Sequence, residues 1–237
     1  MTVRRVGHKG ADHIAPGNTL ASFDAALAAR VDMIEFDVLP EDPDDPAGSR
    51  LLLAHDYEHL GAGAFTLEQG LAHLAADTFA GVELDVDLKL PGYESRVLDA
   101  LHAHGLAHRE LVSTLFMRSL IALRALDPAV RLGWSVPRVK RDYTRSWATK
   151  APAYGLLWNA RRRLPSVAAE HVRAGRCDAL MAHHLLVTPR LVEALRAAGG
   201  DLYVWTVDDA AAIRRLEALG VTGIITNDPR LFGARGA

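Results

Sequence analysis

The chain is short of cysteine, lysine, aromatic residues and net charge. Of its 237 residues, one is a cysteine, Cys177, four are lysines and 6% are aromatic. A single cysteine excludes an intramolecular disulfide and a zinc site built on several cysteines, and it is typical of a reducing compartment. The 27 basic against 29 acidic residues give a net charge of −2, so the chain as a whole lacks the positive field that holds DNA or RNA through counterion release.

Long apolar runs are absent as well. No stretch approaches the roughly 18 consecutive apolar residues of a membrane span. Residues Met1–His8 leave no room for a signal peptide before structured sequence begins. We therefore expect a cytoplasmic protein without a transmembrane segment, folded as one domain over residues 1–237.

Runs of strand length alternate with helical patterns along the whole chain. Such alternation is typical of βα units around a parallel sheet, and eight units predict a (β/α)8 TIM barrel. An open doubly wound sheet is the alternative, although no Gly-x-Gly-x-x-Gly motif follows a strand. The expected strands are Val3–His8, Met33–Val38, Val82–Lys89, Leu111–Thr114, Arg131–Val136, Ala179–Ala182, Leu202–Thr206 and Gly223–Thr226.

One further apolar run, Leu51–His55, does not fit the count of eight. The turn-rich segment before it is too short for a parallel crossover, so we expect a hairpin excursion after the second strand. The expected helix signals are N-caps at Asn18, Thr66, Thr188 and Asp208 and C-terminal glycines at Gly199 and Gly220.

Two of the expected strands carry carboxylates on one face, because side chains alternate across a strand. On the strand 33–38 this face holds Glu35 and Asp37. On the strand 82–89 it holds Glu83, Asp85, Asp87 and Lys89. Buried charges have to pair or bind a cation.

The position of each carboxylate along its strand suggests its role. We interpret Glu83 and Asp85, near the middle of their strand, as members of an ion network inside the barrel, in which Asp85 pairs with Lys89 or Glu83 pairs with a facing arginine. Glu35, Asp37 and Asp87 fall near carboxyl ends of strands, where barrel enzymes have their sites. Three oxygen donors there predict one divalent cation, Mg²⁺ or Ca²⁺ rather than zinc.

Two histidines end neighbouring elements, His8 in the segment 6–10 and His55 in the segment 54–56. Singly, each is more typical of a hydrogen-bonded structural histidine. Beside a carboxylate metal cluster, they predict the acid–base pair that hydrolysis near neutral pH requires. His183 and His184, after the sixth strand, are further candidates for the mouth of the barrel.

Seven short motifs follow one another in a recognisable order: His8-Lys-Gly10, Pro16-Gly-Asn-Thr19, Ile34-Glu-Phe-Asp-Val38, Leu53-Ala-His-Asp56, Val86-Asp-Leu-Lys89, Val204-Trp-Thr-Val207 and Gly223-Ile-Ile-Thr-Asn-Asp-Pro229. This order resembles the glycerophosphodiester phosphodiesterase family, in a superfamily of phosphodiesterase barrels that includes sphingomyelinase D-like enzymes. The resemblance is close over residues 3–89 and 202–230, and over 90–200 it extends only to the barrel rhythm.

The resemblance implies a phosphodiesterase barrel that uses a divalent cation. It matches the two catalytic histidines to His8 and His55 and the metal carboxylates to Glu35, Asp37 and Asp87. It also implies that Lys89 faces the phosphate and that Trp205 forms an aromatic wall beside the alcohol part of the substrate. Without the resemblance, Trp205 is an ordinary packing residue at a barrel end.

The chain departs from the family's pattern at four points. Lys9 stands where the family has Arg, which replaces a bidentate phosphate clamp by a point charge. Gly17 replaces a Glu, and Asp87 replaces a longer carboxylate, in an Asp-x-Lys spelling that also resembles the sphingomyelinase D branch. Only Tyr57–Phe65 separates Asp56 from the next helix, so an insertion common in the family is missing and a more open mouth is expected.

Residues Pro137–Pro165 interleave basic and aromatic side chains. This pattern predicts peripheral contact with a membrane or with a bulky anionic substrate, and a solvated helix with packing aromatics is the alternative. The residues concerned are Arg138, Lys140, Arg141, Arg145, Lys150, Arg161, Arg162, Arg163, Tyr143, Trp147, Tyr154 and Trp158.

The sequence thus predicts a metal-dependent phosphodiesterase that cleaves a glycerophosphodiester to a phosphomonoester and an alcohol. One alternative is a phospholipase D-like lyase, in which a hydroxyl of a lysophospholipid attacks phosphorus and a cyclic phosphate is left. Another is a non-catalytic barrel that binds a phosphorylated ligand. A metal-dependent amidohydrolase is disfavoured, because the first strand has no His-x-His.

Overall fold

The computed structural model describes residues 2–58, 60, 63–137 and 147–233, and of residues 147–154 and 156 it describes only the backbone. The strands are β1 Arg4–Gly7, β2 Met33–Pro40, β3 Leu51–Leu53, β4 Glu83–Leu88, β5 Glu110–Thr114, β6 Arg131–Val136, β7 Ala179–His183, β8 Asp201–Trp205 and β9 Gly223–Thr226. The α-helices are α1 Leu20–Ala28, α2 Leu67–Leu74, α3 Glu94–Ala103, α4 Met117–Leu126, α5 Trp147–Arg173, α6 Pro189–Ala198 and α7 Ala210–Leu219. Short 3₁₀ turns are η1 Asp77–Phe79, η2 His184–Leu186 and η3 Pro229–Phe232.

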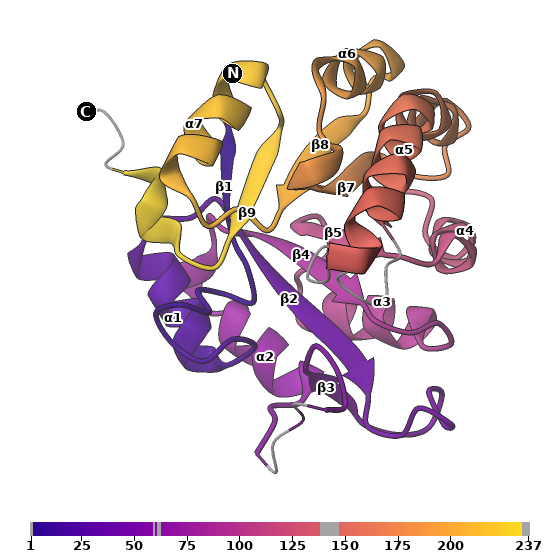
Figure 1. Ribbon diagram of the computed structural model, residues 1–237. Helices are drawn as coiled ribbons and strands as arrows, with labels where there is room; N and C mark the ends of the chain where they lie inside the picture. Colours follow the sequence, from indigo (N-terminus) through magenta and orange to yellow (C-terminus); the bar gives the residue numbers. More distant parts are fainter. Residues whose placement is uncertain (1, 59, 61–62, 138–146, 234–237) are drawn as a thin grey trace.

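Eight parallel strands close into a barrel with helices around it (Figure 1). Strand β1 pairs with β2 on one side and with β9 on the other, so the sheet has no gap between its first and last parallel strands. This closure confirms the (β/α)8 TIM barrel and excludes the open doubly wound sheet. All eight predicted strands are present, with ends that differ by at most two residues.

Strand β3 is the predicted excursion. It runs antiparallel to β2, with Leu53 opposite Val38 and Leu51 opposite Pro40. Because β3 returns toward the end of β2, it carries His55, two residues beyond it, back to the carboxyl end of the barrel.

The helix signals are confirmed in part. Thr66 and Gln69 form a reciprocal capping box, and Thr188 caps α6, which ends at Gly199 in the left-handed conformation (φ 78°). Two predicted N-caps are wrong by one residue, since Thr19 rather than Asn18 caps α1 and Asp209 rather than Asp208 caps α7. The Thr19 hydroxyl and the Asp209 carboxylate cap these helices. Asn18 instead donates a hydrogen bond to Asp37, and Asp208 accepts one from Asn227, both at the barrel mouth.

The barrel interior is layered along its axis. An apolar layer of Val6, Met33, Leu111, Ala179, Met181, Tyr203 and Ile225 fills the middle. Gly133 belongs to this packing, because a Cβ there would lie 2.8–3.0 Å from atoms of Leu111, Met181 and Ser113. The opposite faces of the strands pack against the helices in two larger apolar clusters. The apolar layer thus separates the two charged ends of the barrel.

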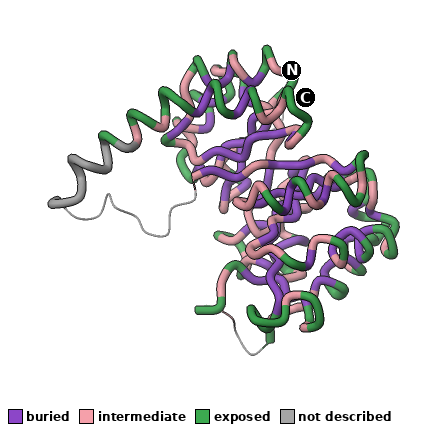
Figure 2. The backbone as a smooth tube through the Cα atoms, turned by 90° about the vertical axis from the view of Figure 1, so that its right-hand side faces the viewer, coloured by how far each residue is buried: buried purple, intermediate pink, exposed green. Residues whose placement is uncertain are grey.

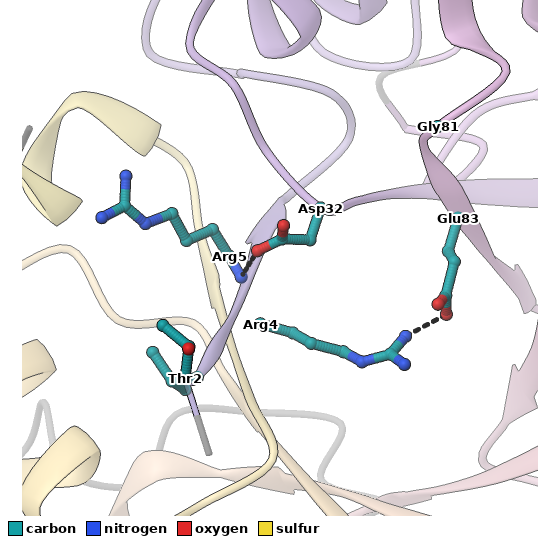
Figure 3. A pocket seen from close by; sticks show the side chains of 7 residues that line it. Thr2, Arg4, Arg5, Asp32, Gly81 and Glu83 are labelled. Carbon is teal, nitrogen blue, oxygen red and sulfur yellow. Dashed lines mark hydrogen bonds and ion pairs between the residues drawn. The ribbon is translucent and has the colours of Figure 1, made fainter. Parts of the chain in front are cut away.

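The amino end of the barrel holds the network predicted for Glu83. Its carboxylate accepts hydrogen bonds from Arg4 and, at 2.9 Å, from Arg131, whose guanidinium also lies 3.4 Å from the Tyr203 hydroxyl. Figure 3 shows Arg4 extended toward Glu83 at a cavity of about 380 Å³. The cavity lies at the end of the barrel opposite to Asp37 and Asp87, so we assign it no part in the predicted chemistry.

Helix α5 is the longest of the described helices, with 27 residues, and at about 1.5 Å per residue it spans about 40 Å. The turns of α5 that follow its grey beginning stand out from the side of the barrel (Figure 2). Even so, no helix of the described ranges is both long and apolar enough to cross a bilayer.

Glu83→Gln tests the structural role of the amino-end network. The change leaves two guanidinium groups facing each other without a carboxylate between them. Because the three side chains are 30–36% exposed, the loss should lie between that of a surface pair and that of a buried pair, about 1–3 kcal/mol. Urea unfolding measures it, and Glu41→Gln, which removes the partner of Arg50 at the surface, is the matched control. Equal stability of the two variants would contradict the network's role.

Candidate functional site

Three carboxylates meet at the carboxyl end of the barrel. Glu35 and Asp37 project inward from β2, and Asp87 projects inward from β4, where it lies opposite Asp37 in the parallel register. One oxygen of each residue lies within 4.8 Å of the others. Glu35 and Asp37 are buried and Asp87 is partly buried. The structure therefore brings together the three residues that the sequence pattern selected.

The charges of this cluster are unbalanced. Lys89 is its cationic partner and forms ion pairs with Asp37 and Asp87. Burial and the neighbouring Asp37 raise the pKa of Glu35 well above its usual value. Burial acts the same way on Asp37, but Lys89 and His55 outweigh it and hold the pKa of Asp37 well below normal. Three carboxylates against one ammonium leave an excess of negative charge, and oxygen donors of this kind suit a hard divalent cation.

Asp85 lies on the same face, next to the cluster but outside it. Burial raises the pKa of Asp85 to about 8, so the group is largely neutral at pH 7. The Ser113 hydroxyl donates a hydrogen bond of 2.7 Å to it. The pairing of Asp85 with Lys89 that the sequence suggested is wrong, since Lys89 reaches past it to Asp37 and Asp87.

His8 lies at the end of β1, in a chain of hydrogen bonds that fixes its ring. The Asn227 amide nitrogen donates to Asp208 at 2.6 Å, which turns the amide oxygen toward His8 Nδ1 at 2.5 Å. Because that oxygen can only accept, Nδ1 carries the proton and Nε2 is the basic nitrogen. Nε2 lies 3.8 Å from a Glu35 oxygen. Burial lowers the pKa of His8 below its usual value.

His55 reaches the cluster from the excursion. Its Nδ1 lies 3.2 Å from Asp37 Oδ2, and its side chain is 49% exposed. The same carboxylate oxygen accepts a hydrogen bond of 2.8 Å from the Asn18 amide, while the Asp37 backbone N–H donates to Asn18 Oδ1 at 3.0 Å. Asp37 is thus held by partners from three other segments of the chain, and it orients His55 in turn.

The turn after His8 brings backbone close to the cluster. The Lys9 N–H donates to Glu35 Oε2 at 2.8 Å. Lys9 and Gly10 both have positive φ, 50° and 85°. A Cβ on Gly10 would lie 2.5–2.7 Å from Ser22 at the start of α1, so glycine is required there. The Lys9 ammonium lies 3.6 Å from a carboxylate oxygen of Asp12.

Trp205 and His183 end the adjacent strands β8 and β7 and lie opposite each other in register. The Trp205 indole donates to the Met181 carbonyl at 2.9 Å, and the His183 ring meets the indole edge-on, with centroids 5.1 Å apart. The His184 ring lies beside that of His183, with centroids 4.3 Å apart and the ring planes tilted by 31°. These rings lie at the same end of the barrel as the carboxylates, and their contact with a substrate stays a prediction.

Asn18, Asn227 and Asp208 are site residues that the sequence did not predict. All three lie in or beside the motifs that carry the resemblance, but Asn18 and Asp208 had a simpler interpretation as helix caps. Asn18 stands next to Thr19, whose hydroxyl can cap the helix by itself. This neighbour is the signal that could have indicated that the Asn18 amide is free to bond a residue of the site.

The sequence matches the model of a known protein family. The family model described as the glycerophosphoryl diester phosphodiesterase family matches residues 8–39 and 96–231. The match includes residues 96–200, where the sequence shows only a barrel rhythm, and it omits the segment with His55, Asp87 and Lys89.

Relatives match over nearly the whole chain. A glycerophosphodiester phosphodiesterase of Caldanaerobacter subterraneus is 25% identical, over 94% of this chain and 93% of its own. A solved enzyme of that name from Parabacteroides distasonis covers 97% of this chain and 94% of its own, with a TM-score of 0.73 and 18% identity. A phosphodiesterase of Oleispira antarctica in complex with the product sn-glycerol-3-phosphate covers 97% and 94%, with a TM-score of 0.69 and 18% identity. The chain belongs to the glycerophosphoryl diester phosphodiesterase family.

Proposed function

We propose that the chain hydrolyses glycerophosphodiesters to glycerol phosphate and an alcohol, with His8 and His55 as its acid–base pair. The family acts on diesters of this class. The observation that carries the proposal is the approach of two histidines, from separate segments, to one carboxylate cluster. Since the proposed site joins residues from His8 to Asn227, we also propose that 1–237 is a single domain.

Glu35, Asp37 and Asp87 would hold one divalent cation, Mg²⁺ or Ca²⁺. When bound, the cation would neutralise charge on the phosphoryl group as phosphorus becomes five-coordinate. Lys89, already paired with two of these carboxylates, would add a fixed positive charge beside it. Lys9 would attract the phosphate as a mobile point charge, and Trp205 would bound the alcohol part of the substrate.

The two histidines would divide the proton transfers. His8, buried and with its proton held on Nδ1 by Asn227, would accept a proton from the attacking water at Nε2. The water oxygen would form the new bond to phosphorus as the bond to the alcohol oxygen breaks. His55, half exposed and oriented by Asp37, would give its proton to the leaving alcohol, and the two histidines would then exchange protons with solvent to restore the starting state.

The motif Asp87-Leu-Lys89 also resembles the sphingomyelinase D branch of the superfamily, so a second reaction is an alternative. In the lyase alternative, a hydroxyl of a lysophospholipid would replace water, with His8 again as the base, and the product would be a cyclic phosphate. A non-catalytic barrel is disfavoured, because both histidines and all three carboxylates are present and meet at one end of the barrel. For the compartment we keep the cytoplasm as our expectation, based on the single cysteine.

Phosphorus NMR distinguishes these reactions directly. The purified chain should convert small glycerophosphodiesters to a phosphomonoester when Mg²⁺ or Ca²⁺ is added. A cyclic phosphate from lysophospholipids would support the lyase instead. If neither the glycerophosphodiesters nor the lysophospholipids are converted with either cation, the result would favour a non-catalytic barrel that binds a phosphorylated ligand.

Asp87→Asn tests the cation site without relying on activity. Cation binding should raise the melting temperature of the wild type, because it relieves repulsion among three carboxylates. Replacing Asp87 should weaken the cation affinity measured by this shift more than about tenfold. Asp85→Asn is the matched control, since Asp85 lies outside the cluster and should keep the shift. An unchanged shift in Asp87→Asn, or turnover that survives chelation, would contradict the assignment.

His8→Ala and His55→Ala should each lower kcat by about 10²–10⁴-fold, the usual effect of losing a general acid or base. Both variants should keep the wild-type circular dichroism spectrum. His73→Ala, which removes a surface partner of Asp24, should leave kcat unchanged and serves as the control. If the two variants instead unfold at much lower temperature while the folded fraction retains full turnover, the histidines are structural.

A further inference from the structure

The segment 138–163, which includes the first 17 residues of α5, differs from the rest of the sequence in charge. Residues 138–163 contain eight basic residues and one acidic residue, a net charge of +7. The other 211 residues contain 19 basic and 28 acidic residues, a net charge of −9. The basic residues of a nearly neutral chain are thus concentrated in one segment of its sequence, a composition typical of segments that contact anionic partners.

Only part of this stretch is described by the structure. Arg138, Lys140, Arg141, Tyr143 and Arg145 lie outside the described residues, as do the side chains of Trp147, Lys150 and Tyr154. Residues 155–163 therefore carry the inference. Arg161, Arg162 and Arg163 are all exposed there, and the next acidic residue along the helix is Glu170.

Two faces of α5 have opposite characters. Leu157, Ala160 and Leu164 face the apolar cluster around the barrel. Trp158 points away from it and is 60% exposed. The Arg162 guanidinium lies 4.6 Å above the centre of the Trp158 ring. A large indole left in water beside arginines has no role in the barrel's own packing.

A second exposed apolar residue is tied to this face. Arg161 Nε donates a hydrogen bond of 2.7 Å to the Leu185 carbonyl in η2. The Leu185 side chain is 39% exposed. We use the name α5 rim for Trp158, Arg161, Arg162 and Leu185. The α5 rim combines two positive charges with an indole and an aliphatic side chain.

We propose that the α5 rim docks the protein on an anionic phospholipid surface. Arginines pair well with lipid phosphates, and tryptophan favours the interface between lipid and water, where its ring is partly buried and its N–H stays wet. An exposed leucine beside them finds a partner in acyl chains, whereas a nucleic acid offers it no apolar groove. The proposal goes beyond the reaction proposed above and does not depend on it.

The position of α5 gives such docking a direction. Leu185 lies in η2, directly after β7, and so at the carboxyl end of the barrel, the end that carries Glu35, Asp37 and Asp87. The hydrogen bond from Arg161 to Leu185 holds the α5 rim at this end. A molecule that rests on its α5 rim would therefore have its proposed site close to the lipid surface.

Vesicle co-sedimentation tests the docking. The wild type should bind phosphatidylcholine vesicles that contain about 30% phosphatidylglycerol, and binding should weaken strongly at about 0.5 M salt. Arg161→Ser with Arg162→Ser should weaken it about 30-fold, from two lost charges near the surface. Trp158→Ser should weaken it about tenfold. The matched controls are Arg214→Ser with Arg215→Ser, two exposed arginines of α7, and Ile121→Ser, 54% exposed on α4, and both should bind like the wild type.

Three outcomes would overturn the proposal. The first is that the α7 double variant loses as much vesicle binding as the α5 double variant. The second is that pure phosphatidylcholine vesicles bind the protein as well as anionic vesicles do. The third is that a single-stranded RNA oligomer binds more tightly than the vesicles and that the α5 substitutions weaken this RNA binding. Circular dichroism of each variant excludes unfolding as the cause. The measurement needs no turnover, so failure of the proposed reaction leaves it intact.

Discussion

The mutual repulsion of Glu35, Asp37 and Asp87 is the constraint on which the carboxyl end of the barrel depends. Parallel register sets Asp37 beside Asp87, and a buried cluster of like charges is unstable unless other groups compensate it. Lys89, His55 and Asn18 all converge on Asp37. Each comes from a different segment, so the same electrostatic requirement draws together strand β4, the β3 excursion and the loop before α1.

The barrel keeps its two charged ends apart. At the amino end, Glu83 satisfies two arginines in a network that is open to water at the cavity. At the carboxyl end, the three carboxylates outnumber the one ammonium group, that of Lys89. The apolar layer between the two ends is closely packed, so charged side chains at one end cannot reach those at the other. The charges at each end are therefore compensated only by groups at the same end. This division explains why one strand, β4, serves a structural pair at its start and a candidate site at its end.

Strand periodicity accounts for most of the fold and the carboxylate cluster that could be predicted from the sequence. Alternation places Glu35 with Asp37, and Glu83 with Asp87, on inward faces, and the barrel then brings these faces together. Periodicity does not resolve a choice between neighbouring polar residues. Asn18 and Thr19 can each cap a helix, as can Asp208 and Asp209, and the tertiary partners Asp37 and Asn227 decide between them. The pairing of Lys89 with Asp37 could not be predicted for a related reason, since spacing along one strand does not report an attraction to a residue on the neighbouring strand β2.

The departures from the family's pattern at positions 9 and 17 belong to one local arrangement. Asp12 Oδ1 accepts a hydrogen bond of 2.8 Å from the Gly17 N–H, and the other carboxylate oxygen faces the Lys9 ammonium. A Cβ on residue 17 would lie 2.6 Å from that carboxylate and 2.9 Å from the Lys9 Cβ. A glutamate at position 17 would therefore have to displace Asp12, the acidic partner that Lys9 has here. Asp12 therefore contacts both positions at which the chain departs from the family's pattern, and the two departures are coupled through this one carboxylate.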